Sequence, residues 1–138
     1  MEPFHHTFRV RYAEVDPQSV VFNSRYLEYA DILVSEHFRE ARTHGMPDDV
    51  EFHVRRAEVD YLAPIRLDEL IEGRLTVESI GTSSMKTLIT LHGADDGALR
   101  AEIRLLTVHV DLPEGHPTPV PDAVRRAFGF PPRETVGG

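Results

Sequence analysis

The first apolar pattern in the chain is an alternation over residues 6–15. Its apolar side consists of Phe8, Val10 and Tyr12, with Arg9 and Arg11 between them. A period of two residues is typical of a half-buried strand, so we predict a strand over this segment. Pro17 lacks an amide hydrogen for further pairing, and residues 16–22 are therefore expected to form a loop.

Residues 24–43 change to a spacing of three and four residues, which is the period of a helix. The apolar positions in that spacing are Tyr26, Leu27, Ala30, Leu33, Val34, Phe38 and Ala41. Asn23 or Ser24 is able to cap the start, and Gly45 with Pro47 stops the helix. The apolar positions cover more than a narrow stripe, so we predict a well-buried helix of roughly 30 Å.

Four further strands follow the helix, because apolar residues alternate again between turn signals. We predict them over residues 52–62, 70–80, 85–91 and 99–112. The dipeptide Ala63-Pro64 bends the chain between the first two. Residues 93–97, Gly-Ala-Asp-Asp-Gly, form a hairpin turn between two apolar runs.

The last segment, residues 113–138, holds six of the ten prolines and is expected to be a loose tail with one short helix. That helix is predicted over residues 122–128, with Asp122 as its cap. Hairpin-joined strands pair antiparallel, and one long apolar helix needs a sheet to cover it. We therefore predict one α+β domain over residues 1–138, with a core of about 5–112, in which a curved antiparallel sheet wraps around one long central helix.

The composition limits what such a domain does. The 138 residues are 41% hydrophobic and 28% charged, as in folded globular proteins, and the formal net charge of −8 argues against nucleic-acid partners. The absence of cysteine excludes disulfides, thiolate nucleophiles and cysteine-based metal sites. No apolar run approaches the roughly 20 residues of a membrane span, and the N-terminus has no signal pattern. We expect a cytoplasmic protein without a membrane partner.

Asp16 is the first candidate for chemistry, because it lies in a short loop seven residues before Asn23 at the predicted helix start. A helix N-terminus offers free amide protons and a partial positive charge, and a carboxylate beside it suits acyl transfer. A turn aspartate before Pro17 is the more common interpretation of this pattern. The neighbouring residues also have interpretations without a catalytic role. Asn23 is then a helix cap, Tyr26 is a core residue, and Glu14 is a solvated or salt-paired side chain.

Other reactive residue types occur without a complete motif. The eight histidines have no metal-binding spacing, so no metal is expected. Ser83 and Ser84 follow Gly81 but lack the second glycine of a nucleophile elbow, which favours a strand bend. There is no glycine-rich phosphate loop, and we expect no cofactor. The basic residues of the predicted strands, with Lys86 as the only lysine, are able to bind a nucleotide phosphate if the fold brings them together.

Four short motifs occur in an order that resembles a known family. They are Arg11–Tyr26 with Asp16-Pro17 inside it, Val59–Ile65 with its proline, the Gly-x-Ser-Ser of Ile80–Ser84, and Pro119–Pro121 before a short helix. Over about residues 5–128 the chain resembles the 4-hydroxybenzoyl-CoA thioesterase-like hotdog family. The hotdog fold is a curved antiparallel sheet around one long helix, which the hydrophobic pattern predicts on its own.

The resemblance implies hydrolysis of the thioester of a small or medium acyl-CoA. Asp16 matches the catalytic carboxylate, as nucleophile or general base, and the backbone N–H near Asn23 matches the group that polarises the thioester carbonyl. The implied substrate contacts are Ser19, Val20, Phe22, Tyr26, Gly81, Ser83, Ser84 and Lys86. The family usually has glycine where Ser19 stands, so this chain departs from the pattern at that position.

The resemblance also implies a homo-oligomer. It is at least a dimer with active sites at its interface, and this branch is often tetrameric; the CoA phosphates are expected to meet surface arginines or Lys86. Two other functions are compatible with the same fold. In a non-catalytic acyl-CoA or acyl-carrier binding protein Asp16 is only a turn residue. A hotdog dehydratase needs a histidine at the site, and residues 16–23 contain none.

Overall fold

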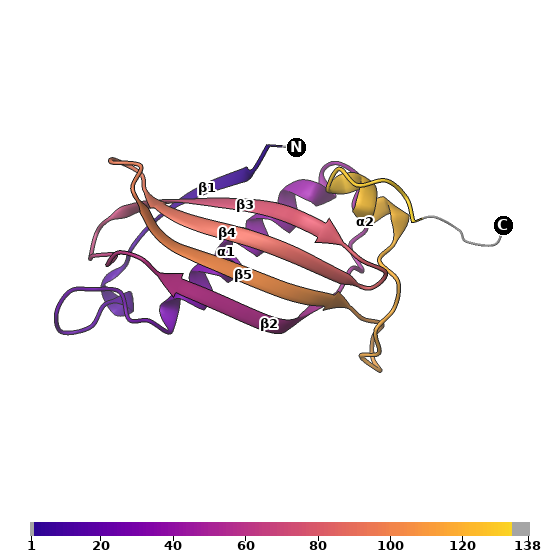
Figure 1. Ribbon diagram of the computed structural model, residues 1–138, viewed down its shortest axis with the longest axis horizontal. Coiled ribbons are helices and arrows are strands. Elements are labelled where there is room, and N and C mark those ends of the chain that lie inside the picture. Colours follow the sequence, from indigo (N-terminus) through magenta and orange to yellow (C-terminus); the bar gives the residue numbers. More distant parts are fainter. Residues whose placement is uncertain (1, 134–138) are drawn as a thin grey trace.

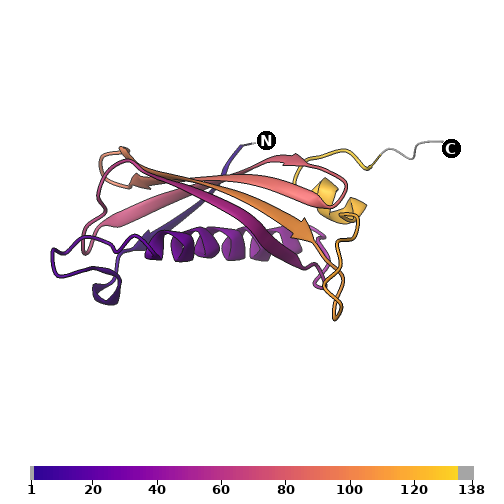
Figure 2. The same ribbon diagram turned by 60° about the horizontal axis from the view of Figure 1, so that its bottom comes forward.

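A five-stranded antiparallel sheet curves around one long helix in the computed structural model, which describes residues 2–133 (Figures 1 and 2). The elements in chain order are β1 (Phe4–Arg9), α1 (Arg25–Arg42), β2 (Phe52–Tyr61), β3 (Leu70–Ile80), β4 (Ser84–Gly93), β5 (Leu99–His109) and α2 (Asp122–Ala127). The strand order is β1-β3-β4-β5-β2, and all neighbours are antiparallel. The predicted α+β hotdog architecture is confirmed. The last five residues of the predicted tail lie outside the described residues.

The helix α1 lies in the concave side of the sheet and forms the core with it (Figure 2). Tyr29 and Leu33 of α1 are at most 1% exposed, as are Ile71 and Ile103 of the strands that they face. Gly73 of β3 allows this close approach. A Cβ atom at that position would lie 2.5 to 2.9 Å from three carbons of the Leu33 side chain, so any larger residue would require Leu33 to shift.

The first strand is shorter than the alternation predicts. β1 ends at Arg9, and Tyr12–Glu14 form a 3-10 turn in which Tyr12 is 83% exposed. The Glu14 side chain accepts a hydrogen bond from the Arg11 amide at 2.8 Å, so this amide bonds a side chain within its own segment. The predicted extension of the strand is wrong because a local side-chain cap replaces strand pairing.

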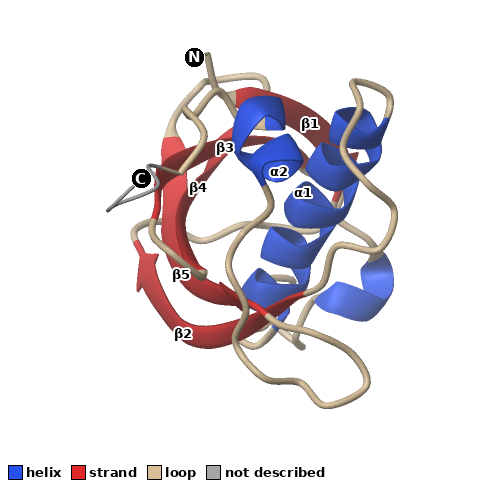
Figure 3. Ribbon diagram, turned by 90° about the vertical axis from the view of Figure 1, so that its right-hand side faces the viewer, coloured by secondary structure: helices blue, strands red, loops and turns tan. Residues whose placement is uncertain are grey.

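The helices lie where the sequence predicts them; one of the two predicted cap positions of α1 is confirmed, whereas the predicted cap of α2 is wrong. Ser24 is the N-cap residue of α1, and neither it nor Asn23 provides a side-chain cap bond. Pro121 takes the cap position of α2, again without a side-chain bond, and Asp122 is already helical. Packing against the rest of the protein therefore fixes the position of both helices. Figure 3 shows α2 beside the C-terminal part of α1, where Val124 is fully buried.

The two edges of the sheet differ. On one side, β1 pairs with the Leu70–Leu75 half of β3. On the other side, β2 is a ten-residue edge strand that pairs only with β5, and most of its side chains are exposed. Val54 is 61% exposed and Tyr61 is 53% exposed. The pairing register of β2 shifts between Val54 and Arg56, and within the described residues this strand has a neighbouring strand on one side only.

Candidate active site

Residues 14–22, which we call the site hairpin, lead from the 3-10 turn to the start of α1. Its paired residues are Val15 with Val21 and Asp16 with Val20. The Ser19 amide donates to the Asp16 carbonyl at 2.9 Å and closes the turn. Ser19 has a φ of 62°, a left-handed conformation that glycine adopts most easily. The predicted loop is therefore a tight hairpin with Asp16 in its turn.

The Asp16 carboxylate is half-buried and is oriented by the backbone of the hairpin. Its Oδ1 accepts hydrogen bonds from the amides of Gln18 at 2.8 Å and Val20 at 3.3 Å. Its Oδ2 has no hydrogen-bond partner among residues 2–133. Asp16 is thus a turn residue, as the more common interpretation predicts. It also keeps one oxygen free to act as a nucleophile or as a base.

Asn23 follows the site hairpin and lies next to the N-cap residue of α1. Its carbonyl accepts a hydrogen bond from the Tyr61 hydroxyl at 3.0 Å, which ties the helix start to the end of β2. The Asn23 amide donates to no acceptor in the described part of the chain. An unengaged N–H at the positive end of a helix is well suited to bind a carbonyl oxygen. Asp16 thus lies in the turn of the site hairpin, and Asn23 is the first residue after this hairpin.

The predicted contacts around this hairpin divide into surface and core. Ser19 and Phe22 are exposed, Phe22 at 53%, and Val20 is half-buried. Tyr26 is only 3% exposed and packs edge-on against Tyr61, with ring centroids 4.8 Å apart. Tyr26 therefore supports the helix start from the core, whereas the other three residues are accessible.

Glu14 lies at the foot of the hairpin and is buried, not solvated. It is 7% exposed and accepts hydrogen bonds from the Arg11 amide at 2.8 Å, the Arg11 Nε at 3.1 Å and the Tyr29 hydroxyl at 3.0 Å. Burial opposes its ionisation, but these hydrogen bonds outweigh burial and hold the pKa of Glu14 below its ordinary value. Burial, together with the Glu14 carboxylate, raises the pKa of Tyr29. Glu14 therefore anchors the hairpin to α1.

The loop between β2 and β3 supports the hairpin from behind. Its Ile65 carbonyl accepts a hydrogen bond from the Val21 amide at 2.8 Å, and its Leu67 amide donates to the Ser19 carbonyl at 3.1 Å. These backbone bonds mean that a shift of the loop also shifts the turn that carries Asp16.

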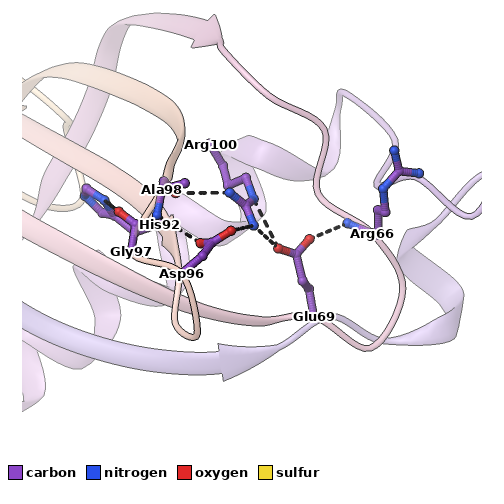
Figure 4. A network of polar contacts seen from close by, with 7 residues as sticks. All are labelled: Arg66, Glu69, His92, Asp96, Gly97, Ala98 and Arg100. Atoms are coloured by element: carbon purple, nitrogen blue, oxygen red, sulfur yellow. Dashed lines mark hydrogen bonds and ion pairs between the residues drawn. The ribbon is translucent and has the colours of Figure 1, made fainter.

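Arg100 of β5 fixes that loop in turn (Figure 4). Its guanidinium pairs with Glu69 and, at 3.0 Å, with Asp96, while the second oxygen of Glu69 accepts the Arg66 amide at 2.8 Å. Gly93 provides the space, because a Cβ atom there would collide with the side chains of Arg100 and Asp96. The sequence carries no signal for this network, since its members come from the β2–β3 loop, the β4–β5 turn and β5.

The remaining predicted contacts lie at the far end of the sheet. Gly81 and Ser83 belong to the β3–β4 turn, Ser84 begins β4, and Lys86 is exposed on β4. Figure 1 shows β3 and β4 side by side in the sheet. The 11 residues of β3, at about 3.3 Å each, separate this turn from the site hairpin. A single chain therefore does not bring these four residues to Asp16.

Arg125 of α2 holds the far turn. It is 6% exposed, and its guanidinium donates to the carbonyl of Ile80 at 3.4 Å and to that of Gly81. The Val120 amide, just before α2, donates to the Thr82 carbonyl at 2.8 Å. The predicted C-terminal helix thus braces the Gly-x-Ser-Ser turn.

The sequence model of the thioesterase-like superfamily matches residues 10–128 of this chain. The chain belongs to this superfamily. A curated relative, the acyl-CoA thioester hydrolase YbgC of Escherichia coli, is 28% identical over 125 residues, which cover 87% of this chain and 91% of the relative. The protein of the same name from Shigella flexneri matches to the same extent.

Solved structures of similar shape include other thioesterases. A thioesterase from Thermus thermophilus, in complex with coenzyme A and zinc, is 26% identical with a TM-score of 0.80, and the match covers 94% of this chain and 99% of that one. The PA5185 protein of Pseudomonas aeruginosa has 22% identity and a TM-score of 0.83 over 97% of this chain and 95% of its own, which shows the shared fold.

Membership of the thioesterase-like superfamily confirms the predicted family and the predicted class of enzyme, a thioester hydrolase. Within residues 2–133, no three histidine, aspartate or glutamate side chains come together in a way that suits a metal ion. The described helices include none that is long and apolar enough to span a membrane.

Proposed function

We propose that this member of the thioesterase-like superfamily hydrolyses the thioester of a small or medium acyl-CoA at the site hairpin. The observation that carries the proposal is the combination of a free carboxylate oxygen on Asp16 with an unengaged amide on Asn23. The name of the YbgC relative and the coenzyme A of the Thermus thermophilus structure support an acyl-CoA as substrate.

In the proposed reaction the thioester carbonyl oxygen accepts a hydrogen bond from the Asn23 amide. The negative charge that develops on this oxygen is then stabilised at the positive end of α1. Oδ2 of Asp16 either attacks the carbonyl carbon or removes a proton from a water molecule that attacks it. In both routes the carbon–sulfur bond breaks and CoA leaves as a thiol. When Asp16 attacks, the acyl group first passes to Oδ2 as a mixed anhydride, which a water molecule then hydrolyses; when Asp16 acts as a base, the water oxygen enters the carboxylic acid directly. Each route consumes one water molecule, which also supplies the proton that the departing thiolate takes up.

A second copy of the chain is part of the proposal. The exposed ten-residue edge of β2 supports pairing with β2 of a partner subunit. A two-fold axis at this edge reverses the direction of the partner's sheet, so its far end lies toward the site hairpin. The residues that the partner subunit contributes in this arrangement are Gly81, Ser83, Ser84 and Lys86. The ammonium of the partner's Lys86 then meets the CoA phosphates. A tetramer and a cytoplasmic location stay predictions.

The test of hydrolysis is release of free thiol from a panel of aliphatic and aromatic acyl-CoAs. The chain has no cysteine, so a thiol-reactive dye reports only the released CoA. We expect activity from the parent and loss of about a thousandfold or more in Asp16→Asn. The exposed Asp95→Asn is the matched control and is expected to keep parental activity. An Asp16→Asn variant as fast as the parent contradicts the proposal. A parent that binds acyl-CoA tightly and releases no thiol favours the binding-protein alternative.

The shared site is tested by mixing two impaired variants, Asp16→Asn and Lys86→Glu. If the site combines Asp16 of one subunit with Lys86 of the partner subunit, each mixed dimer contains one intact site. Random mixing of equal amounts then restores about a quarter of parental activity. If both residues serve a site within one subunit, mixing restores nothing. Unfolding and refolding the variants together, followed by the thiol assay, separates these outcomes.

A further inference from the structure

A cavity of about 330 Å³ lies between α1 and the concave face of the sheet, and we call it the inner cavity. Its walls are mostly apolar, with Val34 and Phe38 from the helix and Met85 and Leu105 from the strands. Its volume exceeds the roughly 150 Å³ of an apolar cavity that binds benzene. Apolar walls around an open hollow of this size are unfavourable in contact with water, which points to an apolar ligand that fills it.

One end of the inner cavity, at Leu27, lies close in sequence to the proposed active site, and its strand walls lie toward the β3–β4 end of the sheet. Leu27 of α1 and Val54 of β2 belong to its lining and are 45% and 61% exposed, so the cavity is open to solvent on the side where α1 and β2 face each other. Leu27 follows Asn23 by four residues, which is one helical turn or about 6 Å. An acyl group whose carbonyl oxygen binds the Asn23 amide is thus placed to run past Leu27 into the cavity. This argument rests on the proposed function.

Three side chains separate the inner cavity from a second, wider hollow, the outer groove. His37, Leu75 and Val77 line both spaces, whereas the outer groove continues along β1 and α2 to a volume of about 1310 Å³. Leu75 and Val77 project from β3, and His37 projects from α1 toward them. These three residues are therefore the partition at the inner end of the cavity.

His37 is held in this partition by aromatic contacts. Its ring stacks on Phe128, the residue after α2, with centroids 4.8 Å apart and packs against Phe4 of β1 at 5.1 Å. Burial lowers the pKa of His37 to about 4, so the imidazole is uncharged at neutral pH and is compatible with an apolar wall. It makes no hydrogen bond with the residues that the structure describes. The contribution of His37 to the wall is therefore the size and flat shape of its ring, not a charge or a hydrogen bond.

We propose that the inner cavity holds the acyl chain of the substrate and that the His37 ring is its end wall, which sets the longest chain that fits. Leu27 and His37 are ten residues apart on α1, or about 15 Å, which accommodates an extended chain on the order of ten carbons. The substrate class is therefore an acyl group of medium length. Longer chains meet the imidazole ring.

The experiment measures binding of S-alkyl-CoA thioethers of increasing alkyl length to the full chain by calorimetry. In the parent, each added methylene is expected to tighten binding about fourfold until the chain reaches His37, after which binding weakens. His37→Ala opens the cavity into the outer groove. We expect the limit to lengthen by about two methylenes and the first excluded ligand to bind about tenfold more tightly.

Two variants separate the wall from other roles of this residue. His37→Phe keeps a flat ring and is expected to keep the parental limit. His44→Ala changes a histidine that lines only the outer groove, and it is also expected to keep the limit. Val77→Ala removes part of the same wall from β3 and should lengthen the limit, which keeps the test valid if His37→Ala fails to fold.

An unchanged limit in folded His37→Ala or Val77→Ala overturns the inference, and so does a limit that lengthens in His37→Phe. Thioethers cannot be hydrolysed, so this readout does not depend on turnover. A parent that binds the thioether series and releases no thiol from acyl-CoA contradicts the proposed hydrolysis alone. A parent whose affinity does not change with alkyl length overturns the inference about the cavity alone.

Discussion

The foot and the turn of the site hairpin carry two carboxylates in opposite settings. At the foot, Glu14 is buried, and donors from Arg11 and Tyr29 occupy both of its oxygens. At the turn, Asp16 is half-buried, and only its Oδ1 is bonded. The comparison teaches that residue type does not decide which carboxylate is able to react. The decisive property is an oxygen that the fold leaves without a partner.

The largest expected difference between the two positions is in turnover. Asp16→Asn should lower kcat by about a thousandfold or more, because the amide that replaces the free oxygen is neither a base nor a nucleophile. Its other oxygen still accepts the amides of Gln18 and Val20, so the free energy of unfolding should change by less than about 0.5 kcal/mol. Thiol release and urea unfolding of the same preparation check both parts. A strongly destabilised Asp16→Asn would mean that the turn, too, depends on the charge.

The next largest effect is at Glu14, where stability rather than turnover is expected to change. Glu14→Gln should lower the free energy of unfolding by about 1–3 kcal/mol, because the buried Tyr29 hydroxyl and the part-buried Arg11 donors lose a charged acceptor. The folded fraction should keep most of its turnover. Glu28→Gln, which changes an exposed partner of Arg25, serves as control with an expected change of less than about 0.5 kcal/mol. If urea unfolding gives the two variants equal stability, Glu14 does not anchor the foot of the hairpin.

Acid titration sharpens the same comparison. The pKa of Glu14 is lower in the folded protein than in the unfolded chain, where 4.5 is the ordinary value. Its ionised form therefore contributes stability above pH 4.5, and this contribution is lost as the pH falls through the lowered folded value. The stability gap between the parent and Glu14→Gln should be constant near neutral pH and should narrow below pH 4.5. A gap that stays constant to pH 3 speaks against the role of the Glu14 charge.

A smaller effect is expected from the network behind the hairpin. Glu69→Gln weakens the ion pair with Arg100 and loosens the loop that bonds to Ser19 and Val21. We expect a loss of about 1–2 kcal/mol in stability and roughly a tenfold fall in kcat with little change in KM, because the substrate contacts are unchanged. Glu102→Gln, which alters a more exposed pair with Arg104, is the control. A kcat that does not respond means that the turn holds its shape without this support.

The smallest effect concerns the backbone at Ser19. Its φ of 62° is unfavourable for a residue with a side chain, so Ser19→Gly should stabilise the protein by about 0.5–1 kcal/mol. Ser19→Ala keeps the strain and should show no gain. Thermal unfolding of the three proteins measures the difference. A gain in Ser19→Ala would show that loss of the hydroxyl, not relief of the backbone, is responsible.

Hydrophobic spacing predicted the long helix and four of the five strands within a few residues, because their apolar faces repeat over many positions. The same spacing gave a wrong prediction after Arg9. The apolar alternation continues there in the sequence, but the Glu14 side chain bonds the Arg11 amide and the chain forms a 3-10 turn. Position in the loop and the family resemblance pointed to Asp16 and Asn23. The Arg100 network and the His37 partition join segments far apart in the chain, so no local pattern indicates them.

The missing side chain at Gly73 has a consequence for how this protein can evolve. Leu33 fills the space that a Cβ atom at position 73 would need, so the two positions are not free to change independently. A larger residue at one position requires a smaller one at the other; otherwise α1 shifts and displaces Asn23 at its start. We expect these two positions to co-vary among relatives, so that a contact in the middle of the sheet helps to preserve the geometry of the proposed active site.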